Sequence, residues 1–226
     1  MKSYCKLLLV ILSLISLSIC HAKAKAKLSP ENANLLTACF KGRKEMAIEA
    51  LKRGADIEIR DGNEGNTPLM FAIRHGHMHM VTMLLDYGAK MEALSMDGEK
   101  TPMLMAAYTG NADVVRELLL RGASGEGANE RGDTPLLLAC YSGQLSVVRL
   151  LLARGVDMNK KSIKQGFSGL YIAASAGYGH VVEELLRQSD AVEVDVQSHL
   201  GRTPLHAAIE HQHIDCMRML IEAGAS

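Results

Sequence analysis

The sequence predicts an all-α protein in which helix–turn–helix units stack into an elongated solenoid. The first reason is a Thr-Pro dipeptide that recurs at spacings of 34, 33 and 69 in a chain of 226 residues. The second is that alanine and glycine recur at fixed distances behind it. The third is composition, since hydrophobic residues make up 48% of the chain and aromatic residues only 4%. A core of Leu, Val, Ala and Met favours packed helices, and a period of this length is typical of repeat proteins.

The repeat can be followed through six copies. Each copy starts at a small or hydroxyl-bearing residue, namely Ala33, Thr67, Thr101, Thr134, Ser168 and Thr203. Five residues after these starts lie alanines, namely Ala38, Ala72, Ala106, Ala139, Ala173 and Ala208. Twenty-one residues after the starts lie Gly54, Gly88, Gly122, Gly155, Ser189 and Gly224. Because these landmarks move in step, we expect units at approximately 29–60, 61–95, 96–130, 131–164, 165–198 and 199–226.

Each unit has the signals of two short helices. Threonine is a favourable helix N-cap, and proline suits the first helical position, where no N–H is needed. Leucine and alanine then lie on one face, and a glycine about nine residues after the start ends the first helix. A second apolar stripe follows, as in Val147-Val148 and Leu151-Leu152. The next 11–13 residues are polar and predict an exposed hairpin-like loop, called a finger below.

Residues 203–208, Thr-Pro-Leu-His-Ala-Ala, carry the clearest likeness to a known family. With Ala-x-x-x-Gly and Val-Val-x-x-Leu-Leu-x-x-Gly-Ala in other copies, the pattern resembles the ankyrin repeat over residues 29–226. The resemblance implies an ankyrin-repeat solenoid that binds a protein partner through its fingers and the exposed side of its first helices. The first copy lacks Thr-Pro and the last has Gln212 at its turn. We expect such atypical end copies to be caps with a polar outer face.

The N-terminus has the composition of a secretory signal. Lys2 and Lys6 precede an apolar run over residues 7–19, which is too short to span a bilayer comfortably, and small residues follow. An uncleaved membrane anchor is one alternative. A lipoprotein is another, because Cys20 follows a lipobox-like segment in which Ile19 replaces the expected small residue.

These features predict the order of segments in the chain. We expect a signal peptide at 1–22, a short leader at 23–28 and the repeat domain at 29–226. Ser29-Pro30 supports that start because it combines an N-cap with a first-turn proline. Cleavage after Ala22 or Ala24 would leave no stable membrane span. The protein is then exported, and its location is periplasmic or secreted.

Cysteine and histidine usage predicts no chemical site. Cys39, Cys140 and Cys216 occupy apolar positions two or three units apart, so we expect no disulfide within the chain. Residues 75–80 read His-Gly-His-Met-His-Met, which could suggest a copper site. The repeat pattern explains most of these residues as core or turn positions. We therefore expect no metal and no cofactor.

Charge and motifs restrict the function. The 25 basic and 25 acidic residues balance, which argues against a nucleic-acid partner. The chain has no phosphate-binding glycine loop, no His-Glu-x-x-His and no nucleophile elbow, so we expect no enzyme. The favoured function is a monomeric, exported protein–protein interaction module. The alternative is a periplasmic accessory protein that supports an enzyme or binds a metal such as copper.

The candidate binding surface follows from the stacking of equal positions. Residues seven and eight places after each start should form a ladder across one concave face, next to residues at the ends of the fingers. Aromatic residues and arginine often dominate interface energy. The predicted partner-binding residues are Phe40, Arg74, His75, Tyr108, Tyr141, Phe167, Arg202 and Glu210. The alternative for Tyr108 and Tyr141 is that they only close gaps between neighbouring repeats.

Overall fold

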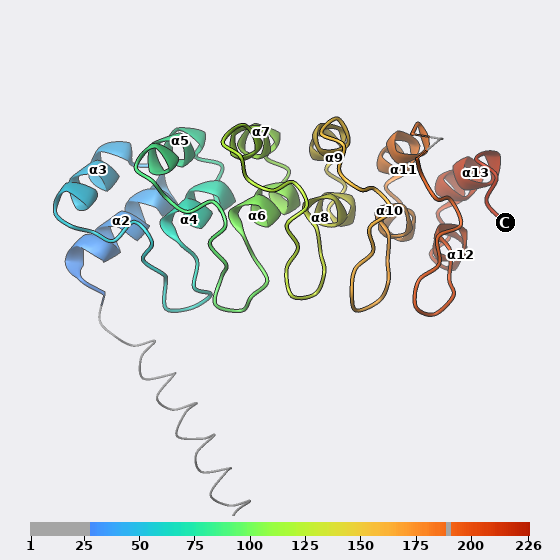
Figure 1. Cartoon of the computed structure of the whole chain (residues 1–226), viewed down its shortest axis with the longest axis horizontal. Coiled ribbons are helices and arrows are strands. Elements are labelled where there is room, and N and C mark those ends of the chain that lie inside the picture. The colour runs from blue at the N-terminus through green and yellow to red at the C-terminus, as the bar shows by residue number, and fades with distance from the viewer. Residues whose placement is uncertain (1–27, 189–190) are drawn as a thin grey trace, which may run out of the picture.

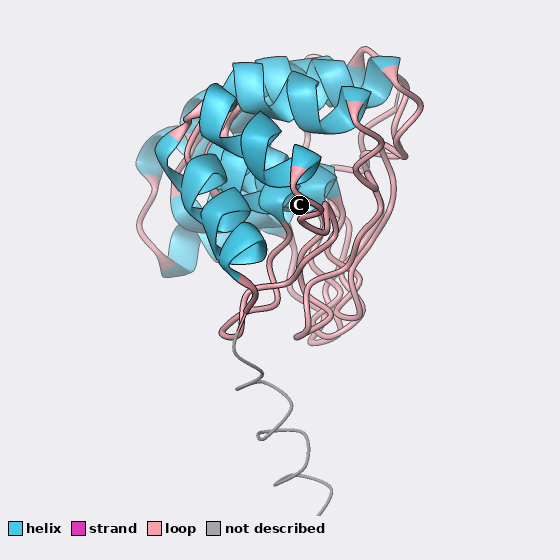
Figure 2. Ribbon diagram, turned by 90° about the vertical axis from the view of Figure 1, so that its left-hand side faces the viewer, coloured by secondary structure: helices cyan, strands magenta, loops and turns pink. Residues whose placement is uncertain are grey.

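The described part of the protein is an all-helical solenoid, as predicted. The computed structural model describes residues 28–188 and 191–226, and these ranges contain helices and no strands. The helices are arranged in consecutive pairs. The first helix of each pair lies in one row, the second helix lies in another row, and the fingers project on one side (Figures 1 and 2). The first helices are α2 (Pro30–Lys41), α4 (Pro68–Arg74), α6 (Pro102–Thr109), α8 (Pro135–Tyr141), α10 (Gly169–Ala176) and α12 (Pro204–Glu210). The second helices are α3 (Lys44–Lys52), α5 (Met78–Asp86), α7 (Ala112–Leu120), α9 (Leu145–Leu152), α11 (Gly179–Leu186) and α13 (Ile214–Glu222).

The first helices begin at the polar caps that the sequence predicts. The Thr101 hydroxyl accepts a hydrogen bond from the Leu104 N–H at 3.2 Å, and Thr134 caps α8 in the same way. Ser29 caps α2 by accepting from the Asn32 N–H at 3.2 Å. Each cap satisfies a backbone donor that has no partner inside its helix, and so the start of each first helix is determined locally.

The turn inside each pair needs a left-handed backbone. Gly110 shows why glycine is used there, because its φ is +77° and an added Cβ would overlap the Gln144 side chain. The equivalent residue in the last pair is Gln212, which has φ +59° and is the one non-glycine residue with positive φ in the described ranges. The last turn therefore carries a backbone strain that the glycine turns avoid.

The core is continuous along the stack and is built from small and aliphatic side chains. The alanines five residues after each unit start are fully buried, namely Ala38, Ala72, Ala106, Ala139, Ala173 and Ala208. Aliphatic residues such as Leu118 and Leu151 fill the space between the two rows and are also fully buried. Small side chains let the helices approach closely, and the low aromatic content of the chain is therefore consistent with this packing.

The fingers are linked along the stack as well as to their own helices. The Met96 N–H donates to the Glu64 carbonyl at 3.2 Å, and the Ile163 N–H donates to the Arg131 carbonyl at 2.9 Å. Each bond joins one finger to the preceding finger. Side chains from neighbouring fingers are thereby held at fixed positions beside the first helices.

The expectation of a polar outer face is wrong at the C-terminal end. Ile209, Ile214 and Ile221 are 53%, 74% and 58% exposed on the last pair. Ile73, which is equivalent to Ile209 in an earlier copy, is only 1% exposed because the next pair covers it. The last pair thus presents apolar side chains to solvent, and the position of Ile209 is one that stacking buries in the preceding pairs.

Two other sequence expectations concern cysteine and the membrane. Cys39, Cys140 and Cys216 are buried and free, and burial raises the pKa of both Cys39 and Cys140 to about 12. Within the described ranges, no helix is long and apolar enough to cross a membrane. The predicted signal peptide at 1–22 falls outside those ranges, and of the predicted leader at 23–28 only Leu28 is described.

Candidate functional site

The predicted ladder lies at the C-terminal ends of the first helices. Eight places after each unit start it comprises Lys41, His75, Thr109, Ser142, Ala176 and His211. Seven places after each start it comprises Phe40, Arg74, Tyr108, Tyr141, Ser175 and Glu210. The buried alanine two residues earlier faces the core, and two residues correspond to a rotation of about 200° around a helix. The ladder side chains therefore point away from the core. Phe40, Tyr108 and Tyr141 are 50%, 51% and 61% exposed.

The ladder aromatics touch their neighbours and still leave half of their surface open. Tyr108 and Tyr141 stack with ring centroids 6.4 Å apart and an interplanar angle of 23°. Phe40 meets the edge of His75 with centroids 4.4 Å apart. These contacts fit the alternative role of the aromatic residues, which is to close gaps between neighbouring repeats. The exposed half of each tyrosine is not used by that role and is available to another molecule.

Arg74 belongs to an ionic cluster centred on Glu64 of the preceding finger. The Glu64 carboxylate accepts hydrogen bonds from Arg74 at 2.5 Å, Lys100 at 2.8 Å and the Asn66 amide at 3.0 Å. The bonds from Lys100, Arg74 and Asn66, in that order of effect, lower the pKa of Glu64 to about 2. The cluster joins two fingers to α4 and orients Arg74 along the ladder.

The remaining predicted residues lie in separate places. Burial, followed by the charges of His77 and Arg74, lowers the pKa of His75. Phe167 stacks on Tyr171 with centroids 4.3 Å apart. Arg202 forms an ion pair with Glu210 in the last repeat. The eight predicted residues thus form small groups along the solenoid, and the structure does not bring them into one cluster.

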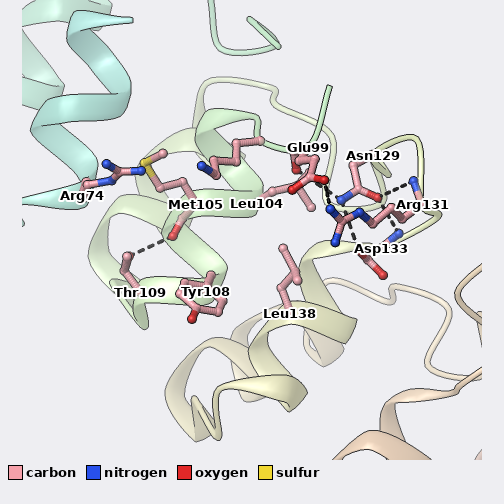
Figure 3. A pocket seen from close by; sticks show the side chains of 11 residues that line it. Arg74, Glu99, Leu104, Met105, Tyr108, Thr109, Asn129, Arg131, Asp133 and Leu138 are labelled. Atoms are coloured by element: carbon pink, nitrogen blue, oxygen red, sulfur yellow. Dashed lines mark hydrogen bonds and ion pairs between the residues drawn. The ribbon is translucent and has the colours of Figure 1, made fainter. Parts of the chain in front are cut away.

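A pocket of about 410 Å³ adjoins the centre of the ladder (Figure 3). Two predicted residues, Arg74 and Tyr108, line it. The other lining residues are Glu99, Lys100, Leu104, Met105, Thr109, Asn129, Arg131, Asp133 and Leu138. None of these nine was among the predicted partner-binding residues, although Thr109 occupies the ladder position eight places after a unit start. The sequence did contain a signal for Lys100 and Asp133. Both lie directly before a unit start, as do Phe167 and Arg202, which were predicted as partner-binding residues.

The histidine segment that suggested copper has a structural use. A ring N–H of His77 donates to the Phe40 carbonyl at 3.1 Å, and one of His79 donates to the Gly42 carbonyl at 2.9 Å. Both bonds tie α5 to the preceding pair. Across the part of the chain that the structure describes, no three His, Cys, Asp or Glu side chains are grouped to hold a metal ion.

Comparison with known proteins agrees with the architecture. A family model described as ankyrin repeats (three copies) matches residues 5–95, 92–162 and 160–226. The chain therefore belongs to the ankyrin-repeat family, whose repeats are generally non-enzymatic and imply protein partners. The first matched range begins inside the segment predicted as a signal peptide, which lies outside the described residues.

One curated relative shows how far the likeness extends. Alpha-latrocrustotoxin-Lt1a from Latrodectus tredecimguttatus is 39% identical over 69 residues, which is 30% of this chain and 5% of the toxin. Because the chain spans so little of that relative, the match concerns a short stretch and not the toxin as a whole.

Proposed function

We propose that the chain is an exported, non-enzymatic interaction module of six ankyrin repeats whose partner protein binds across the ladder and the fingers. The observation that carries this proposal is the pair Tyr108 and Tyr141, which lie side by side and are about half exposed. Membership of the ankyrin-repeat family supports a protein partner. The pocket beside Tyr108 supports the centre of the ladder as the contact region.

A partner would gain binding free energy mainly from contact with the two tyrosines. Tyrosine supplies a large, rigid contact area, and the loss of such a residue from the centre of an interface costs about 2 kcal/mol or more. Loss of either would therefore weaken binding about 30-fold, and loss of both should weaken it by at least that factor, because contributions of neighbouring residues are not additive. The cost to folding is smaller, because each ring already exposes half of its surface.

The test is a double variant, Tyr108→Ala with Tyr141→Ala, compared with the wild type in partner capture from the native compartment. The partner is then identified and its affinity measured. We expect captured partner to fall by at least about 30-fold, while the melting temperature changes little. Tyr87→Ala is the matched control, because Tyr87 is 50% exposed but lies at the end of α5 in the other row. Unchanged capture by the double variant, or an equal loss in Tyr87→Ala, would contradict the proposed surface.

Export is a separate part of the proposal and rests on the composition of residues 1–22. The test compares the full chain with a variant that lacks this segment, by fractionation and N-terminal sequencing of the product. We expect the full chain outside the cytoplasm, with a new N-terminus after Ala22 or Ala24. A full-length product in the membrane would identify an anchor instead, and lipid attached to Cys20 would identify a lipoprotein.

A further inference from the structure

We infer that the pocket beside Tyr108 binds an arginine side chain of the partner, an inference that rests on the proposed function. The pocket lies between α6, α8 and the ends of two fingers, as Figure 3 shows. Its volume of about 410 Å³ is in the range that holds small ligands and side chains. A partner that lies across the ladder would pass directly over its opening.

The inner wall suits the aliphatic part of a long side chain. Leu104 and Met105 are 1% and 6% exposed, and Leu138 from α8 is partly exposed beside them. The ring of Tyr108 stands at one side of this apolar surface (Figure 3). The methylene groups of arginine or lysine can be buried on such a surface while the charged end remains free to find a polar partner.

The three cations in the wall do not make the pocket a site for anions. Arg74 lies 2.5 Å from Glu64, and Lys100 lies 2.8 Å from the same carboxylate. Arg131 forms an ion pair with Glu99. An acidic segment of a partner would have to compete with Glu64 and Glu99 for these groups. The pocket therefore has little free positive charge to offer.

The carboxylate of Asp133 is different. Within the described ranges no basic side chain forms an ion pair with it, and its Oδ2 accepts a hydrogen bond only from the neutral amide of Asn129 at 3.2 Å. The Asp133 N–H in turn donates to the Asn129 Oδ1 at 2.9 Å, so the finger holds this carboxylate in place. The remaining acceptor positions of Asp133 suit an incoming cation.

Arginine fits this combination better than lysine. Its planar guanidinium can form two parallel hydrogen bonds with a carboxylate and can also stack on an aromatic face. Asp133 supplies the first kind of contact and Tyr108 the second. The predicted anchor is thus an arginine whose stem lies on the partly exposed Leu138 and whose guanidinium binds Asp133.

The test is an NMR titration of the full chain with methyl-labelled leucine and methionine. The probe is N-acetyl-arginine amide, and its neutral analogue N-acetyl-citrulline amide has nearly the same shape. We expect saturable shifts of the Leu104, Met105 and Leu138 methyl signals with the arginine probe, and affinity at least about tenfold lower for citrulline. N-acetyl-glutamate amide should not bind.

Asp133→Asn tests the carboxylate itself. The asparagine side chain can keep the bond to Asn129, so the finger should stay intact while the affinity for the arginine probe falls about tenfold. Asp113→Asn is the matched control, since Asp113 lies on α7, outside the pocket, and its side chain is 74% exposed. Its affinity for the probe should equal that of the wild type.

Several outcomes would overturn the inference. They are the absence of saturable shifts, equal affinity for citrulline, tighter binding of the glutamate probe, and unchanged affinity in Asp133→Asn. If any of these occurs while the tyrosine double variant still loses its partner, the interaction surface stands and only the arginine anchor fails. If the arginine probe binds but the double variant keeps its partner, the pocket is real and the proposed surface is wrong.

Discussion

Removing the charge of Glu64 should destabilise the protein at neutral pH and much less in acid. This carboxylate holds Arg74 of α4 and Lys100 of the next finger, and these bonds lower its pKa from 4.5 to about 2. A lowered pKa in the folded state means that the ionised form stabilises the fold. Glu64→Gln keeps the shape of the side chain and removes that charge.

The magnitude follows from the pKa. The shift of Glu64 from 4.5 to about 2 would correspond to about 3 kcal/mol if it were fully expressed in stability. The side chain is 43% exposed, however, so solvent screens the ion pairs and reduces the expected loss to about 1 kcal/mol. The contribution is complete well above pH 4.5 and is lost as the pH falls through about 2. At pH 3 the difference should be less than half of its value at pH 7.

The assay is urea denaturation of the wild type and Glu64→Gln at pH 7 and pH 3. Glu49→Gln is the matched control, because among the residues that the structure describes Glu49 forms an ion pair only with Arg53, on the same exposed helix face. That change should cost at most about 0.5 kcal/mol. The reasoning is refuted if Glu64→Gln costs no more than the control at pH 7. It is also refuted if the cost of Glu64→Gln does not decrease at pH 3.

Three further predictions concern the core, the last turn and the thiols. Leu118→Ala should lower the free energy of unfolding by about 3 kcal/mol, because the side chain is fully buried, and a loss below about 1 kcal/mol in chemical denaturation would contradict this packing. Gln212→Gly should raise it by about 1 kcal/mol by relieving the left-handed backbone at φ +59°, and a decrease would contradict the strain. Cys39 and Cys140, whose pKa is raised to about 12 by burial, should resist a thiol reagent at pH 8 until urea unfolds the chain. Rapid labelling of either thiol in the native protein would contradict their burial.

The repeat could be predicted because its signals are local. Thr101 needs only the Leu104 N–H three residues away to start α6, and Gly110 needs only its own freedom at positive φ to end it. The buried Ala106 follows from the same period. Such features recur wherever the local sequence recurs, so the helix pairs and their order can be deduced without coordinates.

The role of the histidine segment could not be deduced from the local sequence. Residues 75–80 kept copper binding as an alternative, and only the structure shows that the rings of His77 and His79 donate to carbonyls of the preceding pair. The partners, Phe40 and Gly42, lie 37 residues earlier in the chain. A hydrogen bond over that separation depends on how neighbouring units stack.

The same distinction applies to the centre of the ladder and to the last helix pair. The sequence alone placed Tyr108 and Tyr141 on consecutive units at one exposed position, and the structure agrees that both are about half exposed. It did not indicate that Ile209 would be left open, because an apolar residue at that position is buried only when another pair follows.

Helix caps, glycine turns and apolar periods act within a few residues, so the helix pairs, their turns and the ladder positions can be predicted from the sequence. Which charged side chains are neutralised depends on contacts between repeats. Arg131 finds Glu99 on the preceding finger, whereas Asp133 finds no basic partner within the described ranges. That difference depends on side chains that stacking brings together, and it determines the electrostatic character of the pocket beside Tyr108.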